Sequence, residues 1–229
     1  MGRLVRAIDV SNYQPRDLTS LLTPDSEHVV VRLFLPWEQP DPQHSIDQVA
    51  SVRANGRTVG GYVWAYRSQS PEETALETLK LCERMNPPLV LPLIWFDCEE
   101  DGRGDPGPDA DWLSRAVAQA EALETLCGTY TRLGWIRDVF PGGEAEFAAF
   151  GRLPGWFAQW DGMVTLDGVW LPQGFERAMG KQYSRVPLDQ DVFDRDVTVY
   201  EPSPPPDPCT RLRAALQAEY ARKPYKAIT

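Results

Sequence analysis

The segment that most constrains the fold is residues 89–101, where a long apolar run ends abruptly in acidic residues. Residues 89–96 are almost all apolar, a pattern typical of a strand buried on both faces, as in a parallel sheet covered by helices. Asp97 and Glu99 follow directly. Because side chains two positions apart in a strand share a face, these carboxylates point the same way, with α-carbons about 6–7 Å apart. Such acids must be solvated, paired or used, since burying an unpaired carboxylate costs free energy.

The rest of the chain alternates strand and helix at first and is mostly strand later. Strands are predicted at residues 3–10, 29–34, 58–66, 128–131, 156–160, 180–184 and around 192–193. Helices are predicted at 45–55, 70–85 and 110–126, with a short helical piece at 144–150. Ser70 is the expected cap of the second helix, because a proline and two acids follow it. The pattern predicts an α/β fold, an irregular TIM-like parallel barrel in which helices become sparse in the last third.

Charge and hydropathy exclude several classes of function. The chain has 229 residues and a formal net charge of -10, and it shows no basic stripe of the kind that binds nucleic acid. The same charge disfavours an anionic membrane surface, and no apolar run is long enough to span a bilayer. The first residues enter a strand without a signal-peptide core, so we expect synthesis in the cytoplasm.

Cysteine and histidine usage argues against a metal or cofactor. The four cysteines form no Cys-x-x-Cys pair, and only two histidines are present. We therefore predict no metal and no cofactor, and we expect the cysteines to be buried free thiols. The acids that follow the apolar strand resemble no calcium loop and are expected to be solvated. They are Asp101, Asp105, Asp109 and Asp111.

Four acids stand where predicted strands end. They are Asp9, Asp97, Glu99 and Asp189. In a parallel barrel, the residues that carry chemistry gather at the carboxyl ends of the strands. Asp189 is the least certain in register, because Asp191 is a near neighbour and the two could exchange roles.

Five short motifs occur in a fixed order along the chain. They are Asp-Val-Ser-Asn-Tyr-Gln at 9–14, Asp-Cys-Glu at 97–99, Gly-Trp-Phe-Ala-Gln-Trp at 155–160, Gln-Tyr at 182–183 and Leu-Asp-Gln-Asp-Val-Phe at 188–193. In order and spacing they resemble the motifs of family 25 of the glycoside hydrolases, the muramidases common in phage endolysins. Each motif alone is weak, and their shared order makes the resemblance specific.

The resemblance implies an organisation for the whole chain. It covers roughly residues 3–195 and implies a muramidase-like barrel of eight strands with about five helices over residues 1–200. A Pro-rich linker is predicted at 201–208, followed by a short helical tail at 209–229. A helix this short needs a surface to pack on, so we expect the tail to dock on the barrel or on a virion protein.

The resemblance also implies a reaction, the cleavage of the β-1,4 bond between N-acetylmuramic acid and N-acetylglucosamine in peptidoglycan glycan strands. By this resemblance Glu99 is the general acid. Asp97 would stay ionised and assist the N-acetyl group of the substrate, which acts as the internal nucleophile. Asp9 and Asp189 would hold sugar hydroxyls or tune the field around Glu99.

Further substrate contacts are predicted around these acids. They are Tyr62, Trp64, Tyr66, Trp160, Gln182 and Arg32. Two stretches depart from the family pattern near the start of the sugar groove. Residues 32–36 read Arg-Leu-Phe-Leu-Pro where the family usually has Lys-Ala-Thr-Glu-Gly, and residues 60–64 read Gly-Gly-Tyr-Val-Trp in place of Gly-Ala-Tyr-His-Phe.

Two functions of different classes remain open. One is an active muramidase that acts on the bacterial cell wall after release or as part of a virion. The other is a non-catalytic module on the same fold, which binds cell-wall glycan or serves as a structural part of a virion. The presence of all four acids favours the enzyme.

Overall fold

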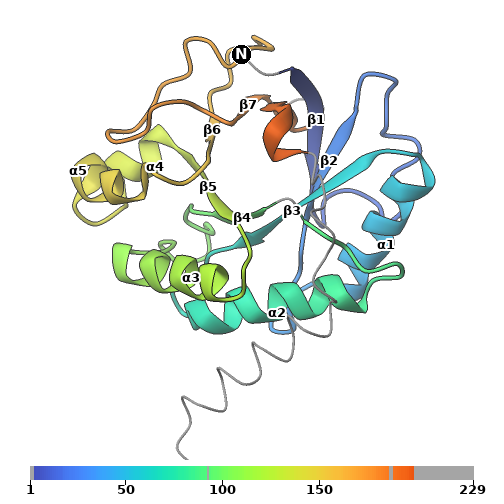
Figure 1. Cartoon of the computed structure of the whole chain (residues 1–229), viewed down its shortest axis with the longest axis horizontal. Helices are drawn as coiled ribbons and strands as arrows, with labels where there is room; N and C mark the ends of the chain where they lie inside the picture. The colour runs from blue at the N-terminus through green and yellow to red at the C-terminus, as the bar shows by residue number, and fades with distance from the viewer. Residues whose placement is uncertain (1–2, 92, 186–187, 199–229) are drawn as a thin grey trace, which may run out of the picture.

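The computed structural model describes residues 3–91, 93–185 and 188–198, and this part of the chain forms a closed barrel of eight strands (Figure 1). Neighbouring strands in the sequence are neighbours in the sheet. The strands are β1 (Leu4–Val10), β2 (His28–Arg32), β3 (Thr58–Trp64), β4 (Ile94–Asp97), β5 (Cys127–Arg132), β6 (Gly155–Ala158), β7 (Gly180–Ser184) and β8 (Gln190–Asp194). The predicted eight-stranded barrel is confirmed.

Helices cover the outside of the barrel unevenly. Those of the first half are α1 (Pro42–Ala54), α2 (Pro71–Arg84) and α3 (Ala110–Ala122). After β5, the described part of the chain has α4 (Leu133–Asp138), α5 (Gly143–Phe147) and the single-turn helices η1 (Ala148–Phe150) and η2 (Arg195–Val197). In Figure 1 the three longer helices surround one side of the barrel. The predicted loss of helices in the last third is confirmed for the described residues.

The last strand corrects the expectation of an entirely parallel barrel. Strands β1 to β7 pair parallel with one another. Strand β8 pairs antiparallel with both β7 and β1. The cause is the short connection, because only residues 185–189 separate β7 from β8. A parallel connection needs a crossover of a dozen or more residues. Residues that precede β8 therefore lie at the same end of the barrel as residues that follow the other strands.

Strand β4 shows how side-chain alternation sets the lining of the barrel. Trp95 points into the barrel and packs with Trp156 and Phe193, at ring-centroid distances of 5.7 and 5.9 Å. Phe96 points outward and meets Trp112 of α3 at 6.0 Å. The same alternation continues past the strand and turns Asp97 inward. The aromatic packing below holds this strand end in place.

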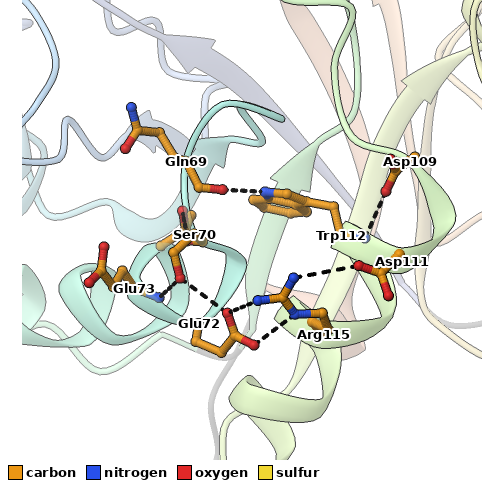
Figure 2. A network of polar contacts seen from close by, with 9 residues as sticks. Gln69, Ser70, Glu72, Glu73, Asp109, Asp111, Trp112 and Arg115 are labelled. Carbon is orange, nitrogen blue, oxygen red and sulfur yellow. Dashed lines mark hydrogen bonds and ion pairs between the residues drawn. The ribbon is translucent and has the colours of Figure 1, made fainter.

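A polar network joins α2 to α3 over the outside of the barrel (Figure 2). The Ser70 hydroxyl caps α2, and Glu72 in its first turn accepts two hydrogen bonds of 2.9 Å from Arg115 of α3. Asp109 caps α3 by accepting from the backbone N–H of Trp112 at 2.8 Å. The predicted cap at Ser70 is thus confirmed, and charge-assisted contacts hold these two helices together.

The loop between β4 and α3 corrects the expectation that its acids are merely solvated. The Asp105 carboxylate accepts hydrogen bonds from the backbone N–H groups of Arg67, Ser68 and Gly107. Asp101 accepts two more from N–H groups within the loop. Loop backbone has no strand or helix partner for its N–H groups, and these carboxylates supply one.

Several predictions concern other parts of the chain. Cys82, Cys98 and Cys127 are buried free thiols, as expected. Helix α4 was not predicted, because it begins directly after β5 and no side chain caps its start. The helices of the described residues are too short or too polar to cross a bilayer. The predicted linker at 201–208 and tail at 209–229 lie outside the described residues and stay predictions.

Candidate active site

A cavity of about 460 Å³ opens at the end of the barrel where β1 to β7 end and β8 begins. Every predicted site residue except Tyr66 lines it. The predicted residues in its wall are Asp9, Arg32, Tyr62, Trp64, Asp97, Glu99, Trp160, Gln182 and Asp189. Residues distant in the sequence therefore meet in one place, four of them carboxylic acids.

The end of β4 brings Asp97 and Glu99 to the same side. Asp97 is 3% exposed, and the intervening Cys98 is fully buried on the opposite face. Sheet-like backbone hydrogen bonds continue past the strand, from Ala65 N to the Asp97 carbonyl and from Cys98 N to the Tyr130 carbonyl. The alternation read from the sequence thus extends to Glu99.

Glu99 is an acid that keeps its proton up to near-neutral pH. Burial raises the pKa of Glu99 to about 7, even though the Arg132 guanidinium acts to lower it. Arg132 Nε lies 2.9 Å from Glu99 Oε1, and the same guanidinium also pairs with Glu100. Glu100 in turn raises the pKa of Glu99 through its own negative charge. Near neutral pH, Glu99 therefore exists in both its protonated and its ionised form.

Asp97 corrects the expectation of a carboxylate that simply stays ionised. Burial first, and then the negative charge of Glu99, raise the pKa of Asp97 well above its ordinary value, with Arg32 opposing. Asp97 Oδ1 has no hydrogen-bond partner among the described residues. A buried carboxylate without a donor is costly in its charged form, so Asp97 retains its proton to a higher pH than an exposed aspartate does.

Gln182 connects Asp9 to the aromatic wall of the cavity. Its amide nitrogen donates to Asp9 Oδ2 at 2.9 Å, and its amide oxygen accepts from Tyr130 Oη at 3.1 Å and Trp160 Nε1 at 2.7 Å. Burial and the charge of Asp189 raise the pKa of Asp9 to about 7, although the bond from Gln182 lowers it. Asp9 is thus a second acid that titrates near neutral pH.

Asp189 and Asp191 occupy different layers of the barrel. Asp189 lines the cavity, and burial raises its pKa to about 6 against the opposing charge of Arg185. Asp191 is fully buried below it and accepts a hydrogen bond of 3.0 Å from Trp156 Nε1. The geometry therefore favours Asp189 as the residue that faces a substrate.

Tyr66 has a different place from the one predicted. Strand β3 ends at Trp64, so the alternation that would bring Tyr66 into the cavity stops before it. Its hydroxyl instead accepts from Arg32 Nη2 at 3.1 Å, while Arg32 pairs with Glu38 at 2.6 Å and lies 4.9 Å from the centre of the Trp64 ring. Tyr66 supports the wall from behind rather than forming it.

The cavity also contains residues that sequence reasoning missed. Tyr130 and Arg132 point inward from β5, next to the acidic end of β4. Their spacing of two on one strand was a usable signal. Ser11, Tyr13, Trp156 and Arg185 complete the wall. Among the described residues, no group of three His, Cys, Asp or Glu side chains is arranged to hold a metal ion.

Comparison with known proteins places the sequence near one set of relatives. No family model matches the chain. The probable GH family 25 lysozyme 4 of Dictyostelium discoideum is 22% identical over 173 residues, which are 73% of this chain and 77% of that protein.

Solved structures extend the comparison to the fold. A muramidase from Acremonium alcalophilum superposes with a TM-score of 0.64 at 19% identity, over 93% of this chain and 99% of that one. The family GH25 lysozyme of Aspergillus fumigatus gives a TM-score of 0.60 at 15% identity, over the same shares of the two chains. The resemblance read from the sequence motifs is confirmed, and this chain has the fold of the family 25 glycoside hydrolases.

Proposed function

We propose that this chain is a peptidoglycan hydrolase, an N-acetylmuramidase that cleaves the β-1,4 bond between N-acetylmuramic acid and N-acetylglucosamine. One observation carries the proposal. Glu99 has a pKa of about 7 in a cavity that also holds Asp9, Asp97 and Asp189. An acid that is protonated near neutral pH, beside further carboxylates, is the combination that glycoside hydrolysis requires.

Glu99 is the proposed general acid. Its protonated form donates to the glycosidic oxygen as the bond to the anomeric carbon breaks, so the leaving sugar departs as a neutral alcohol. Glu99 is left as a carboxylate, and Arg132, 2.9 Å away, stabilises that form. The carboxylate then accepts a proton from the water that completes hydrolysis.

Asp97 is the proposed partner of the substrate's N-acetyl group. Its Oδ1 has no donor among the described residues, so it can accept the acetamide N–H. Such a hydrogen bond stabilises the ionised form of Asp97. Because Asp97 and Glu99 interact electrostatically, substrate binding would lower the pKa of Asp97 and keep the proton on Glu99. The acetamide oxygen, positioned in this way, is the internal nucleophile.

The remaining wall of the cavity suits a glycan. Tyr62, Trp64 and Trp160 offer apolar ring surface, and Asp9 and Asp189 offer acceptors for sugar hydroxyls. Two structurally similar proteins support a peptidoglycan substrate. The modular autolysin LytC from Streptococcus pneumoniae was solved with a synthetic peptidoglycan ligand, and the Cpl-1 endolysin with a peptidoglycan analogue. Their TM-scores to this chain are 0.64 and 0.59.

A non-catalytic glycan-binding module is the second candidate. The observation in its favour is the ion pair of Arg132 with Glu99, which lowers the pKa of the proposed acid and engages its carboxylate. A barrel with Glu99 held permanently as an anion would bind glycan without cutting it, on a cell wall or within a virion.

Purified peptidoglycan distinguishes the two. An active muramidase lowers the turbidity of a peptidoglycan suspension and releases new reducing ends. Glu99→Gln should reduce the rate on the order of a hundredfold or more, because an amide cannot donate the required proton. Glu121→Gln, which removes the exposed partner of Arg152 outside the cavity, is the matched control and should retain most activity.

Two outcomes would contradict the proposal. Near-normal turnover by Glu99→Gln would exclude Glu99 as the acid. Co-sedimentation of the wild type with peptidoglycan, without any new reducing ends, would favour the binding module.

A further inference from the structure

Three arginines line the cavity, and they differ in how their charge is used. Arg32 and Arg132 each pair with glutamate side chains. Arg185 is exposed and forms no ion pair with any residue in the ranges the structure describes. Its guanidinium instead lies 4.5 Å from the centre of the Trp160 ring. The rim of an otherwise acidic cavity therefore carries a cation that forms no ion pair with a described side chain.

The support beneath Arg185 is firmly built. Trp160 Nε1 donates to Gln182 at 2.7 Å, and Gln159 N donates to the Gln182 carbonyl at 3.0 Å. The next residue, Asp161, pairs with the fully buried Lys181 through contacts of 2.7 and 2.9 Å. The loop that carries Trp160 is thus attached to strand β7 by an ion pair with the buried Lys181, and the Trp160 ring lies beneath Arg185.

We propose that Arg185, held over Trp160, is a binding site for a carboxylate of the substrate. This inference rests on the proposed function and names the part of peptidoglycan that the rim recognises. The carboxylate is that of the lactyl group of N-acetylmuramic acid or, where that group is amide-linked, one of the attached stem peptide.

The charge distribution around the cavity supports this assignment. Four acids line the cavity and the chain is strongly acidic overall, so an anionic substrate group is repelled from most of this face. Arg185 is close enough to Asp189 to lower the pKa of that acid, so it lies beside the acids rather than remote from them. A guanidinium presents its planar, paired donors to a carboxylate, and the Trp160 ring fixes the orientation of that plane.

The assignment predicts that the protein distinguishes β-1,4-linked glycans that carry carboxylates from those that carry none. Strands of N-acetylglucosamine alone carry no carboxylate, whereas peptidoglycan carries one on every second sugar or on its peptide. Arg185 would therefore strengthen binding of the anionic polymer and contribute nothing to the neutral one.

The test measures dissociation constants in a Glu99→Gln background, where binding is separated from turnover. The ligands are peptide-bearing strands, peptide-free strands, the same two preparations with their carboxyl groups converted to amides, and neutral N-acetylglucosamine oligomers. Arg185→Gln should weaken binding of the carboxylated strands about tenfold and leave the amidated and neutral ones unchanged. Arg185→Lys should retain part of the affinity. Loss on peptide-free strands identifies the lactyl carboxylate, and loss confined to peptide-bearing strands identifies the stem.

Arg152→Gln is the matched control, because Arg152 is exposed, pairs with Glu121 and lies outside this cavity. The inference is overturned if Arg185→Gln weakens amidated and carboxylated strands equally, or weakens neither. Turnover of the chain that retains Glu99 tests the proposed function independently of these binding measurements. Carboxylate-dependent binding without turnover would leave the rim site standing and contradict the enzyme. Turnover by the Glu99-containing chain, together with dissociation constants for carboxylated strands that Arg185→Gln does not change, would do the reverse.

Discussion

Folding shifts the pKa of acidic side chains in opposite directions on the outside of the barrel and in the cavity at its end. On the outer layer, hydrogen bonds from Arg115 lower the pKa of Glu72 (Figure 2). In the loop before α3, burial alone would raise the pKa of Asp105, but backbone N–H donors outweigh it and the pKa is lowered. At the barrel mouth, burial and neighbouring acids raise the pKa of Asp9 and Glu99 to about 7. Residues of the same type thus stabilise the fold in one region and oppose it in the other.

The comparison separates structural acids from chemical ones. A carboxylate that accepts several hydrogen bonds is held ionised and strengthens the fold. Carboxylates buried against one another retain protons and cost stability, which a chain tolerates where the proton is used. The following substitutions test this distinction, from the largest expected effect to the smallest.

Asp97→Asn should slow hydrolysis on the order of a hundredfold or more, because the amide cannot stabilise the acetamide as a carboxylate does. Turnover on peptidoglycan, measured as reducing ends, checks the size of the effect. A glucan without 2-acetamido groups should not be cut by the wild type. Efficient cleavage of such a glucan would refute assistance by the substrate.

Asp189→Asn should reduce the rate about tenfold or more, and Asp191→Asn should reduce it less. Asp189 lines the cavity, whereas Asp191 accepts from Trp156, and an asparagine at 191 retains an acceptor for that indole. Parallel kinetic assays of the two variants give the ranking. The reverse ranking would mean that the deeper acid is the one the reaction needs.

Asp9→Asn should stabilise the protein at pH 8 by on the order of 4 kcal/mol and have little effect at pH 4. The pKa of Asp9 rises from 3.8 when unfolded to about 7 when folded, so the folded state binds the extra proton between these values. Stability due to this group is therefore present at low pH and lost as the pH rises to 7. Urea denaturation at both pH values measures it. Equal effects at pH 4 and pH 8 would contradict the raised pKa.

Glu72→Gln should have the smallest effect, a loss of about 0.5 kcal/mol with no change in activity. The pair is largely solvent-exposed at Arg115, which is 51% exposed, and salt screens such pairs. The pKa of Glu72 is lowered on folding, so this contribution is present above the unfolded pKa and disappears as the pH falls below it. A decrease in turnover for this variant would show that the contact between α2 and α3 affects the cavity at the end of the barrel.

The sequence was most informative where local pattern and strand geometry coincide. The apolar run before Asp97 predicted a buried strand, and alternation then placed Asp97 and Glu99 together on the cavity side. Ser70 was identified as a helix cap because a proline and two acids follow it. These features depend on neighbours in the chain, and the chain itself reveals them.

Features that depend on distant partners were missed or mispredicted. The direction of β8 follows from the length of its connection and the closure of the sheet. Asp105 was expected to be solvated, but N–H groups from another loop hold it. Arg132 pairs with Glu99 only because β5 lies beside β4. The raised pKa of Asp97 depends on burial by the whole barrel. Each of these requires a partner that the local sequence does not specify.

The pairing of β8 with β1 has a consequence for how the protein is made. Residues 190–194 pair with residues 4–8, and Asp9 N donates to the Asp189 carbonyl at 3.4 Å. During synthesis, β1 therefore cannot pair with β8 until almost the entire barrel has left the ribosome. Closing so long a loop is a slow, late step in folding. Asp9 and Asp189 meet only at that step, so a nascent or truncated chain that ends before residue 189 carries no complete set of the four cavity acids.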